Sequence, residues 1–270
     1  MKLSVLITTY NSETWLEKVL VGYSNQTETD FEVVIADDGS DEKTKRIIEK
    51  FSYAYKFPIQ HVWHEDHGFQ KCKILNKAIL ASKSDYLLFT DGDCIPRNDF
   101  VATHLKHQET GFFLSGGYFK LSLDISNKIA FKNIENQDCF SIKWLLKNGL
   151  KANFKITKLT KNKFIAHFLN WLTPTKKTFN GHNTSCFKAD LIAVNGFNED
   201  MQYGGLDREL GERLFHFGLF SKQIRYNAIC VHLDHKRSYA TNETWDKNFA
   251  IREYNKTHSV TIIANGIFKE

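Results

Sequence analysis

The sequence predicts an α/β fold with a mostly parallel central sheet and helices on its flanks. Over the first hundred residues, short apolar runs alternate with segments whose apolar residues recur at helical spacing. Strand–helix–strand units of this length imply parallel strands joined by right-handed crossovers. The composition, 42% apolar and 25% charged in 270 residues, is that of a globular chain that can bury a core. No Gly-x-Gly-x-x-Gly turn follows the first strand, which argues against a dinucleotide site.

Four strands are expected in this part of the chain, at residues 3–7, 31–36, 59–64 and 86–89. Asn11 or Ser12 is expected to cap the helix after the first strand. Three helices between the strands are each marked by apolar residues on one face: Trp15, Leu16, Val19, Leu20 and Tyr23; then Ile47, Ile48 and Phe51; then Ile74, Leu75, Ala78 and Ile79.

Residues 120–178 have a different composition, with twelve lysines, three acidic residues and no arginine. They also carry seven large aromatic side chains: Phe131, Phe140, Trp144, Phe154, Phe164, Phe168 and Trp171. We predict a helical, lysine-rich insert. Its lysines are either the solvated face of ordinary amphipathic helices or a surface for an acceptor or an anionic membrane. Because readers of nucleic-acid bases usually use arginine, no nucleic-acid partner is expected.

The last third of the chain again carries short polar motifs. Residues 180–185 are expected to form a loop and residues 195–197 a turn. Gly204 and Gly205 precede a predicted helix, and their missing side chains are expected to let an acceptor approach. Residues 224–231 are predicted to form a strand, and His232 follows it.

Cysteine usage and hydropathy indicate the compartment. Five scattered cysteines without a Cys-x-x-Cys pair argue against a disulfide framework or a structural zinc site, and favour a reducing cytoplasm. The first apolar run is too short for a signal-peptide core, and no stretch reaches the roughly 18 apolar residues of a spanning helix. We therefore expect a cytoplasmic protein, peripheral at most at the inner face of the plasma membrane. The net charge of +5 does not choose between anionic partners.

Two acidic clusters follow predicted strands. Asp37-Asp38-Gly-Ser follows the second strand, and Asp91-Gly-Asp93 follows the fourth. Both fall at the edge where parallel sheets bind ligands, beyond the carboxyl ends of the strands. Two carboxylates spaced like Asp91 and Asp93 can face one Mg²⁺ or Mn²⁺ ion, while a substrate's phosphates complete its shell. Taken singly, each cluster can also be an acidic turn or a helix cap.

Four side chains in the last third are further candidates. His232 and His235 follow a predicted strand, where they are either metal ligands through a neutral imidazole or plain surface histidines. Asp207 and Glu209 lie at a predicted helix start, where acids either stabilise the helix dipole or supply a general base.

The order of these motifs resembles glycosyltransferase family 2. The matching segments are Val5-Leu-Ile-Thr-Thr-Tyr-Asn, Asp37-Asp-Gly-Ser and Asp91-Gly-Asp. Three later segments resemble the carboxy-terminal part shared by β-1,4-galactosyltransferases and bacterial chondroitin-polymerase domains: Asn195-Gly-Phe-Asn-Glu, Gly204-Gly-Leu-Asp-Arg-Glu and Val231-His-Leu-Asp-His. The resemblance implies one GT-A domain over residues 1–270 with a Rossmann-like sheet. Its nucleotide-binding part would span about 1–119, the basic insert about 120–178, and the acceptor and catalytic part about 179–270.

The resemblance implies roles for the matching positions in the first part. Asp38, with Asp37 beside it, would contact the uridine. Lys71 would face the base or the diphosphate, or else be a solvated lysine at a helix start. Asp91 would lie near the ribose or the metal, and Asp93 would bind the metal directly.

Three positions in the last third complete the implied site. His232 matches the family's metal-binding histidine, and His235 is a second candidate ligand for the Mn²⁺ or Mg²⁺ ion. Asp207 matches the general base that follows paired glycines. Leu206 departs from the pattern, since the family usually has glutamate there.

The implied activity is inverting transfer of a hexose or N-acetylhexosamine from a UDP-sugar to a carbohydrate acceptor, free or lipid-linked. Bacterial surface polysaccharide or lipopolysaccharide synthesis is the expected setting. The alternative is a nucleotide-sugar-binding module that has lost catalysis, against which an intact Asp207 argues. The sugar itself is left open, with Asn180, His182 and Asn183 as candidates to line its pocket.

Overall fold

The computed structural model describes residues 1–55, 57–235 and 242–269. The strands of these residues are β1 (Leu3–Thr9), β2 (Phe31–Asp37), β3 (Ile59–Trp63), β4 (Tyr86–Asp91), β5 (Cys94–Pro96), β6 (Phe112–Ser115), β7 (Gly117–Lys120), β8 (Thr184–Phe187), β9 (Phe220–Gln223) and β10 (Ile229–His232). The helices are α1 (Glu13–Ser24), α2 (Glu42–Ala54), α3 (Lys71–Ala81), α4 (Phe100–His107), α5 (Leu123–Lys128), α6 (Phe131–Glu135), α7 (Ile142–Lys147), α8 (Lys163–Leu172), α9 (Lys188–Ala193), α10 (Leu206–His216) and α11 (Asn242–Thr257), with 3₁₀ turns η1 (Asp138–Phe140) and η2 (Phe154–Leu159).

A seven-stranded sheet of order β3-β2-β1-β4-β8-β6-β9 forms the centre of the fold, and a second sheet has the order β5-β10-β7. β1 pairs in parallel with β2 and β4, and β2 pairs in parallel with β3. β8 is antiparallel to both of its neighbours. The mostly parallel sheet that the sequence predicted is therefore confirmed.

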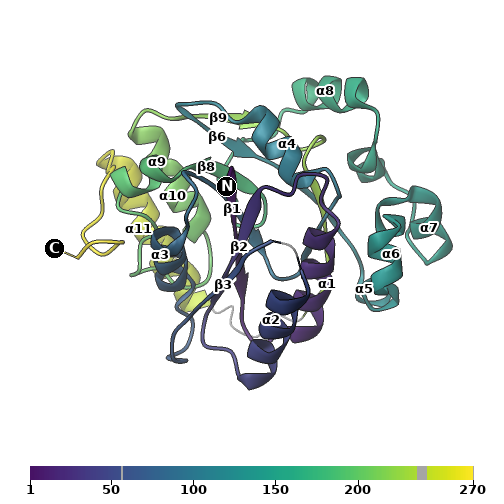
Figure 1. Ribbon diagram of the computed structural model, residues 1–270. Helices are drawn as coiled ribbons and strands as arrows, with labels where there is room; N and C mark the ends of the chain where they lie inside the picture. Colours follow the sequence, from purple (N-terminus) through teal and green to yellow (C-terminus); the bar gives the residue numbers. More distant parts are fainter. Residues whose placement is uncertain (56, 236–241, 270) are drawn as a thin grey trace.

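Helices cover both faces of the large sheet (Figure 1). One hydrophobic core contains Val5 and Val33 together with residues of α1 and α2, and the other contains Leu6 and Val34 together with residues of α3, α9 and α10. Consecutive strand residues enter opposite cores because side chains alternate across a strand. Burial on both faces explains why β1, β2 and β4 are nearly continuous apolar runs.

The four predicted strands are confirmed as β1 to β4, and the three predicted helices as α1 to α3. Some local predictions differ from the structure. Ser12 occupies the N-cap position of α1, as one of the two predicted alternatives, but its side chain makes no capping bond, and the Asn11 side chain accepts from the Asp41 N–H at 2.9 Å. Residues 184 and 185 of the predicted loop 180–185 belong to strand β8. Only residues 229–231 of the predicted strand 224–231 are extended, as part of β10, because residues 225–227 form a turn between β9 of one sheet and β10 of the other.

The insert is helical, as predicted, but its two halves are packed differently. The first half adds Ile125, Ile134 and Leu145 to the core that holds α1. In the second half, α8 buries only Ala166. Within the described residues, no helix combines the length and the hydropathy needed to cross a bilayer.

Candidate active site

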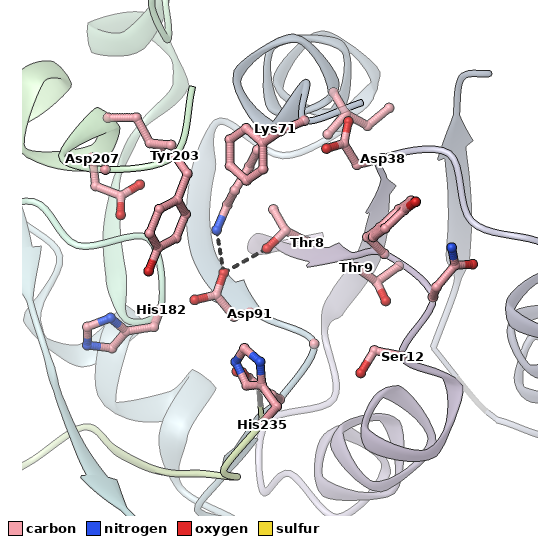
Figure 2. A pocket seen from close by; sticks show the side chains of 18 of the residues that line it. Thr8, Thr9, Ser12, Asp38, Lys71, Asp91, His182, Tyr203, Asp207 and His235 are labelled. Carbon is pink, nitrogen blue, oxygen red and sulfur yellow. Dashed lines mark hydrogen bonds and ion pairs between the residues drawn. The ribbon is translucent and has the colours of Figure 1, made fainter. Parts of the chain in front are cut away.

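A cavity of about 760 Å³ opens at the carboxyl ends of β1 and β4. β2 and β3 extend to one side of β1 while β4 begins the other, which makes this the switch point of the sheet, where such folds bind ligands. Figure 2 shows Asp91 near the middle, Asp207 and Tyr203 on one side, and Asp38 on the other. Of the residues to which the resemblance gives a role in the nucleotide, metal or base site, all but Asp37 line this cavity: Asp38, Lys71, Asp91, Asp93, Asp207, His232 and His235.

Asp91 ends β4 and forms the centre of a charged network. Its Oδ1 accepts from Lys71 Nζ and from Thr8 Oγ1, each at 2.7 Å (Figure 2). Burial opposes ionisation of this carboxyl, but Lys71 and the Thr8 hydrogen bond hold the pKa of Asp91 below its ordinary value. Burial also disfavours charge on Lys71, yet Asp91 and Asp207 hold the pKa of Lys71 above its ordinary value. Lys71 and Asp91 are therefore both charged at neutral pH.

Asp93 meets two histidines because β5 and β10 pair antiparallel, with Cys94 opposite His232. The Leu233 N–H donates to the Asp93 carbonyl at 2.9 Å, next to this pairing. From Asp93 Oδ2, the Nε2 of His235 lies at 2.8 Å and the Nε2 of His232 at 3.6 Å. The two imidazole rings stack with their centroids 5.9 Å apart.

This cluster has the donor chemistry of a divalent metal site. His232 Nδ1 lies 2.8 Å from the Leu233 carbonyl, so Nδ1–H donates there and Nε2 is the ring nitrogen left to face a metal. Asp93, Cys94 and His232 offer ligand atoms within 4.8 Å of one another. Burial raises the pKa of the Cys94 thiol, which leaves the carboxylate and the imidazole as the available donors.

Asp207 lies in the first turn of α10 and faces the cavity from the side opposite Asp38 (Figure 2). The backbone at Gly181 lies so close to the Asp207 carboxylate that a Cβ on Gly181 would be 2.7 Å from Oδ1. This Oδ1 atom is buried without a hydrogen-bond partner. Burial raises the pKa of Asp207, and Lys71 offsets only part of that rise. A carboxylate with an unpaired buried oxygen and a raised proton affinity is suited to accept a proton.

The two aspartates after β2 have different surroundings. Asp38 lines the cavity, and its Oδ1 lies 2.8 Å from His64 Nε2. Asp37 is 1% exposed and does not line it. Its carboxylate accepts from the Ser40 N–H and lies 2.8 Å from His61 Nε2. Asp37 therefore holds the loop that carries Asp38, and the structure offers it no direct contact with a ligand in the cavity.

Glu209, two residues after Asp207, also lies outside the cavity. Its Oε1 is 2.7 Å from Arg213 Nε, and both side chains are buried. Arg213 also donates to the carbonyls of Val194 and Gly196. The pair fastens α10 to the preceding turn, so Glu209 is placed as a structural residue rather than as a second base.

Of the three candidates named for the sugar pocket, only His182 lines the cavity. Its ring lies 4.5 Å from that of Tyr118, centroid to centroid. Burial lowers the pKa of His182 to about 4, so the imidazole is neutral at pH 7. Asn183 is fully buried and donates to the Gly117 carbonyl, and Asn180 lies outside the lining.

An aromatic row that the sequence did not indicate borders the Asp207 side of the cavity. Phe69, Tyr203 and Trp245 lie edge to face, with successive ring centroids 6.0 Å apart. Gly204, which has a φ of +113°, would meet the Trp245 ring at 2.8 Å if it carried a Cβ. The missing side chain of Gly204 therefore makes room for Trp245 of α11, while Gly204 and Gly205 both line the cavity and close approach of an acceptor to them stays a prediction. Nothing in the sequence of α11 marks it as part of the site.

Comparison with known proteins bears on the family. The model for "Glycosyl transferase family 2" matches residues 4–161. Chondroitin synthase of Pasteurella multocida is 30% identical over 234 residues, which cover 82% of this chain and 24% of that protein. The uncharacterized glycosyltransferase YfnE of Bacillus subtilis is 26% identical over 294 residues, 97% of this chain and 73% of its own length. The chain thus spans about a quarter of the chondroitin synthase that it matches.

Solved structures share the fold at low identity. S. aureus TarS in complex with UDP-GlcNAc superposes with a TM-score of 0.63 at 17% identity, over 96% of this chain and 69% of that chain. Mannosyltransferase PcManGT from Pyrobaculum calidifontis, in complex with GDP-Man and Mn²⁺, superposes with a TM-score of 0.58 at 18% identity, over 95% of this chain and 61% of that chain. These likenesses confirm the GT-A fold class. The match of the family model over residues 4–161, more than half of the chain, shows that the chain belongs to glycosyl transferase family 2.

Proposed function

We propose that this chain transfers a hexose or N-acetylhexosamine from a UDP-sugar to a carbohydrate acceptor, with inversion and with the help of a divalent cation. One observation carries the proposal: a single cavity collects Asp38, the Asp93–His232 pair and Asp207. Asp38 and Asp207 lie on opposite sides of it, which suits a donor nucleotide on one side and an acceptor on the other (Figure 2). The UDP-GlcNAc bound by TarS and the Mn²⁺ bound by PcManGT support this choice of donor and cation.

Asp93 and His232 would hold the cation, with His235 and Asp91 as the neighbouring donors. When bound, the cation offsets the negative charge on the departing diphosphate. The buried Lys71 ammonium, held charged by Asp91 and Asp207, adds positive potential to the same part of the cavity.

Asp38 would position the nucleotide. Only one lone pair of its Oδ1 is used by His64, so the carboxylate can still accept from a uracil N–H or a ribose hydroxyl. Leaving such a donor unmatched in a buried site costs about 1–3 kcal/mol.

Asp207 would take the proton from the attacking acceptor hydroxyl. The hydroxyl oxygen then forms its bond to the anomeric carbon while the bond from that carbon to the diphosphate oxygen breaks on the opposite face. This displacement inverts the anomeric configuration and needs no covalent enzyme intermediate. Tyr203 and Trp245, beside Asp207, offer flat apolar surfaces with polar edges on which an acceptor sugar can rest.

We propose the cytoplasm and bacterial surface polysaccharide or lipopolysaccharide synthesis as the setting, with a free or lipid-linked acceptor. Five free, buried cysteines support a reducing compartment. A screen of UDP-sugars for turnover, with Mn²⁺, with Mg²⁺ and with EDTA, tests the activity. Sugar transfer that stops in EDTA is expected. UDP binding without turnover or hydrolysis of any UDP-sugar would instead identify an inactive binding module.

A further inference from the structure

The ten-residue helix α8 is amphipathic, but its apolar side chains face solvent instead of the core. Phe164 is 88% exposed, Trp171 78% and Phe168 54%. Ile165 and Leu172 beside them are also about half exposed, at 48% and 55%. Figure 1 shows α8 at the edge of the molecule.

The polar side of α8 fastens it to the body of the protein. Asn170 Nδ2 donates to Asn227 Oδ1, and Asn170 Oδ1 accepts from the Tyr226 N–H at 3.0 Å. At the other end, Asn162 Oδ1 caps the helix by accepting from the Phe164 N–H at 2.9 Å. The outward apolar face is therefore held by specific contacts on the opposite face, which are made mainly by polar and small residues.

The segment around this face is uniformly basic. No aspartate or glutamate occurs between Asp138 and Asp190. Exposed lysines lie on both sides of α8: Lys151, Lys155, Lys161, Lys163, Lys176 and Lys177. Phe154, in η2, adds another aromatic ring that is 81% exposed.

We propose that α8 and its flanking lysines dock this protein on the surface of an anionic phospholipid bilayer. An amphipathic helix with Trp, Phe and Leu on one face and lysines around it lies in the plane of a bilayer, with its rings at the headgroup boundary. Lysines close to an anionic leaflet strengthen that contact, and salt weakens it. A second copy of the chain fits this surface less well, since a two-fold contact would bring two basic segments together.

The first test uses the whole chain and sedimentation with vesicles. We expect binding to vesicles of equal parts phosphatidylcholine and phosphatidylglycerol, little binding to phosphatidylcholine alone, and release by high salt. The triple variant Phe164→Ser, Phe168→Ser, Trp171→Ser should lower the partition coefficient at least about tenfold. Tyr53→Ser is the matched control, because Tyr53 is 92% exposed on α2, outside the insert, and should leave the partition unchanged.

The charge is tested separately. Lys161→Glu with Lys163→Glu should also lower the partition at least about tenfold, whereas Lys77→Glu, at an exposed position on α3, should not. Equal sedimentation with both kinds of vesicle, insensitive to salt and to these variants, would overturn the proposal. So would a dimer in light scattering that the triple aromatic variant converts to monomers, because α8 would then bind a second copy.

Fluorescence gives a readout that a folding defect cannot imitate. Brominated phosphatidylglycerol should quench part of the tryptophan emission of the parent, and Trp171→Phe should remove that part while keeping the vesicle binding. Equal quenching in parent and variant would show that α8 does not enter the bilayer surface. Unchanged melting temperatures of all variants are expected, since the replaced side chains are exposed.

Discussion

Replacing Asp207 with asparagine tests the proposed base most directly, because the amide keeps the size of the side chain and removes the proton acceptor. A positioned base contributes about 10²–10⁴-fold. At about 1.36 kcal/mol per tenfold, that is roughly 2.7–5.4 kcal/mol of the barrier. The other cavity carboxylates, Asp38, Asp91 and Asp93, already have partners, and Glu209 is buried against Arg213. With no described carboxylate free to replace it, we expect a loss of about 10³-fold or more.

The assay is steady-state turnover of the UDP-sugar with its acceptor, together with UDP affinity by calorimetry in the presence of Mn²⁺. Turnover should fall while UDP affinity stays that of the parent, because Asp207 acts on the acceptor. Asp85→Asn, at an exposed position before β4, is the control and should behave like the parent. Near-parental turnover of Asp207→Asn would eliminate Asp207 as the base.

The raised pKa of Asp207 makes two pH-dependent results specific to this residue. Asp207 must be ionised to accept a proton, so kcat/KM of the parent should fall with decreasing pH at a value above the ordinary aspartate pKa of about 3.9. The folded state binds this proton more tightly than the unfolded state. The free energy of unfolding therefore decreases as pH rises from the ordinary aspartate pKa through the raised one, and the whole decrease is present above both. Asp207→Asn should thus melt at the same or a higher temperature than the parent at pH 7.

Three further results are expected. Asp93→Ala and His232→Ala should each abolish Mn²⁺-dependent turnover, and parental activity that persists in EDTA would refute the metal site. Asp38→Ala should weaken UDP binding by about 1–3 kcal/mol in calorimetry, and equal affinity in the folded variant would exclude a contact with the nucleotide. Glu209→Ala should lower the free energy of unfolding in urea by about 3–5 kcal/mol, because it leaves the buried Arg213 guanidinium unpaired; an unchanged midpoint would contradict its structural role.

The sequence was sufficient to predict the four parallel strands β1 to β4 and the edge that carries the site, but not β6, β8 and β9, which complete the large sheet. Buried parallel strands leave continuous apolar runs, and ligand-facing residues follow them, so Asp38 and Asp91 could be found from position alone. The approach of His232 to Asp93 could not be found in this way, because β5 and β10 are far apart along the chain. It was expected only from the resemblance, and the antiparallel pairing of those strands now explains it.

At other positions the sequence indicated suitable residue types but not which side chains face the cavity. Asp37 and Asp38 are adjacent, and only Asp38 faces the cavity. Residues i and i+2 of a helix do not share a face, which separates Glu209 from Asp207. The packing of Trp245 on Gly204 and the outward apolar face of α8 depend on tertiary contacts that periodicity does not report.

The first turn of α10 carries two acids, Asp207 and Glu209, which have different roles. Leu206, where the family pattern has glutamate, is 5% exposed and packs in the core, so it places no second carboxylate beside Asp207. Glu209 turns to the opposite face and secures the helix through Arg213. Asp207 is thereby held in the cavity lining by a helix that cannot easily rotate, and its buried Oδ1 has no hydrogen-bond partner. Because a base must be aligned with the proton that it removes, the buried pair supports the chemistry without touching the substrate. Its loss should therefore reduce the amount of folded enzyme before it changes the mechanism of the enzyme that remains.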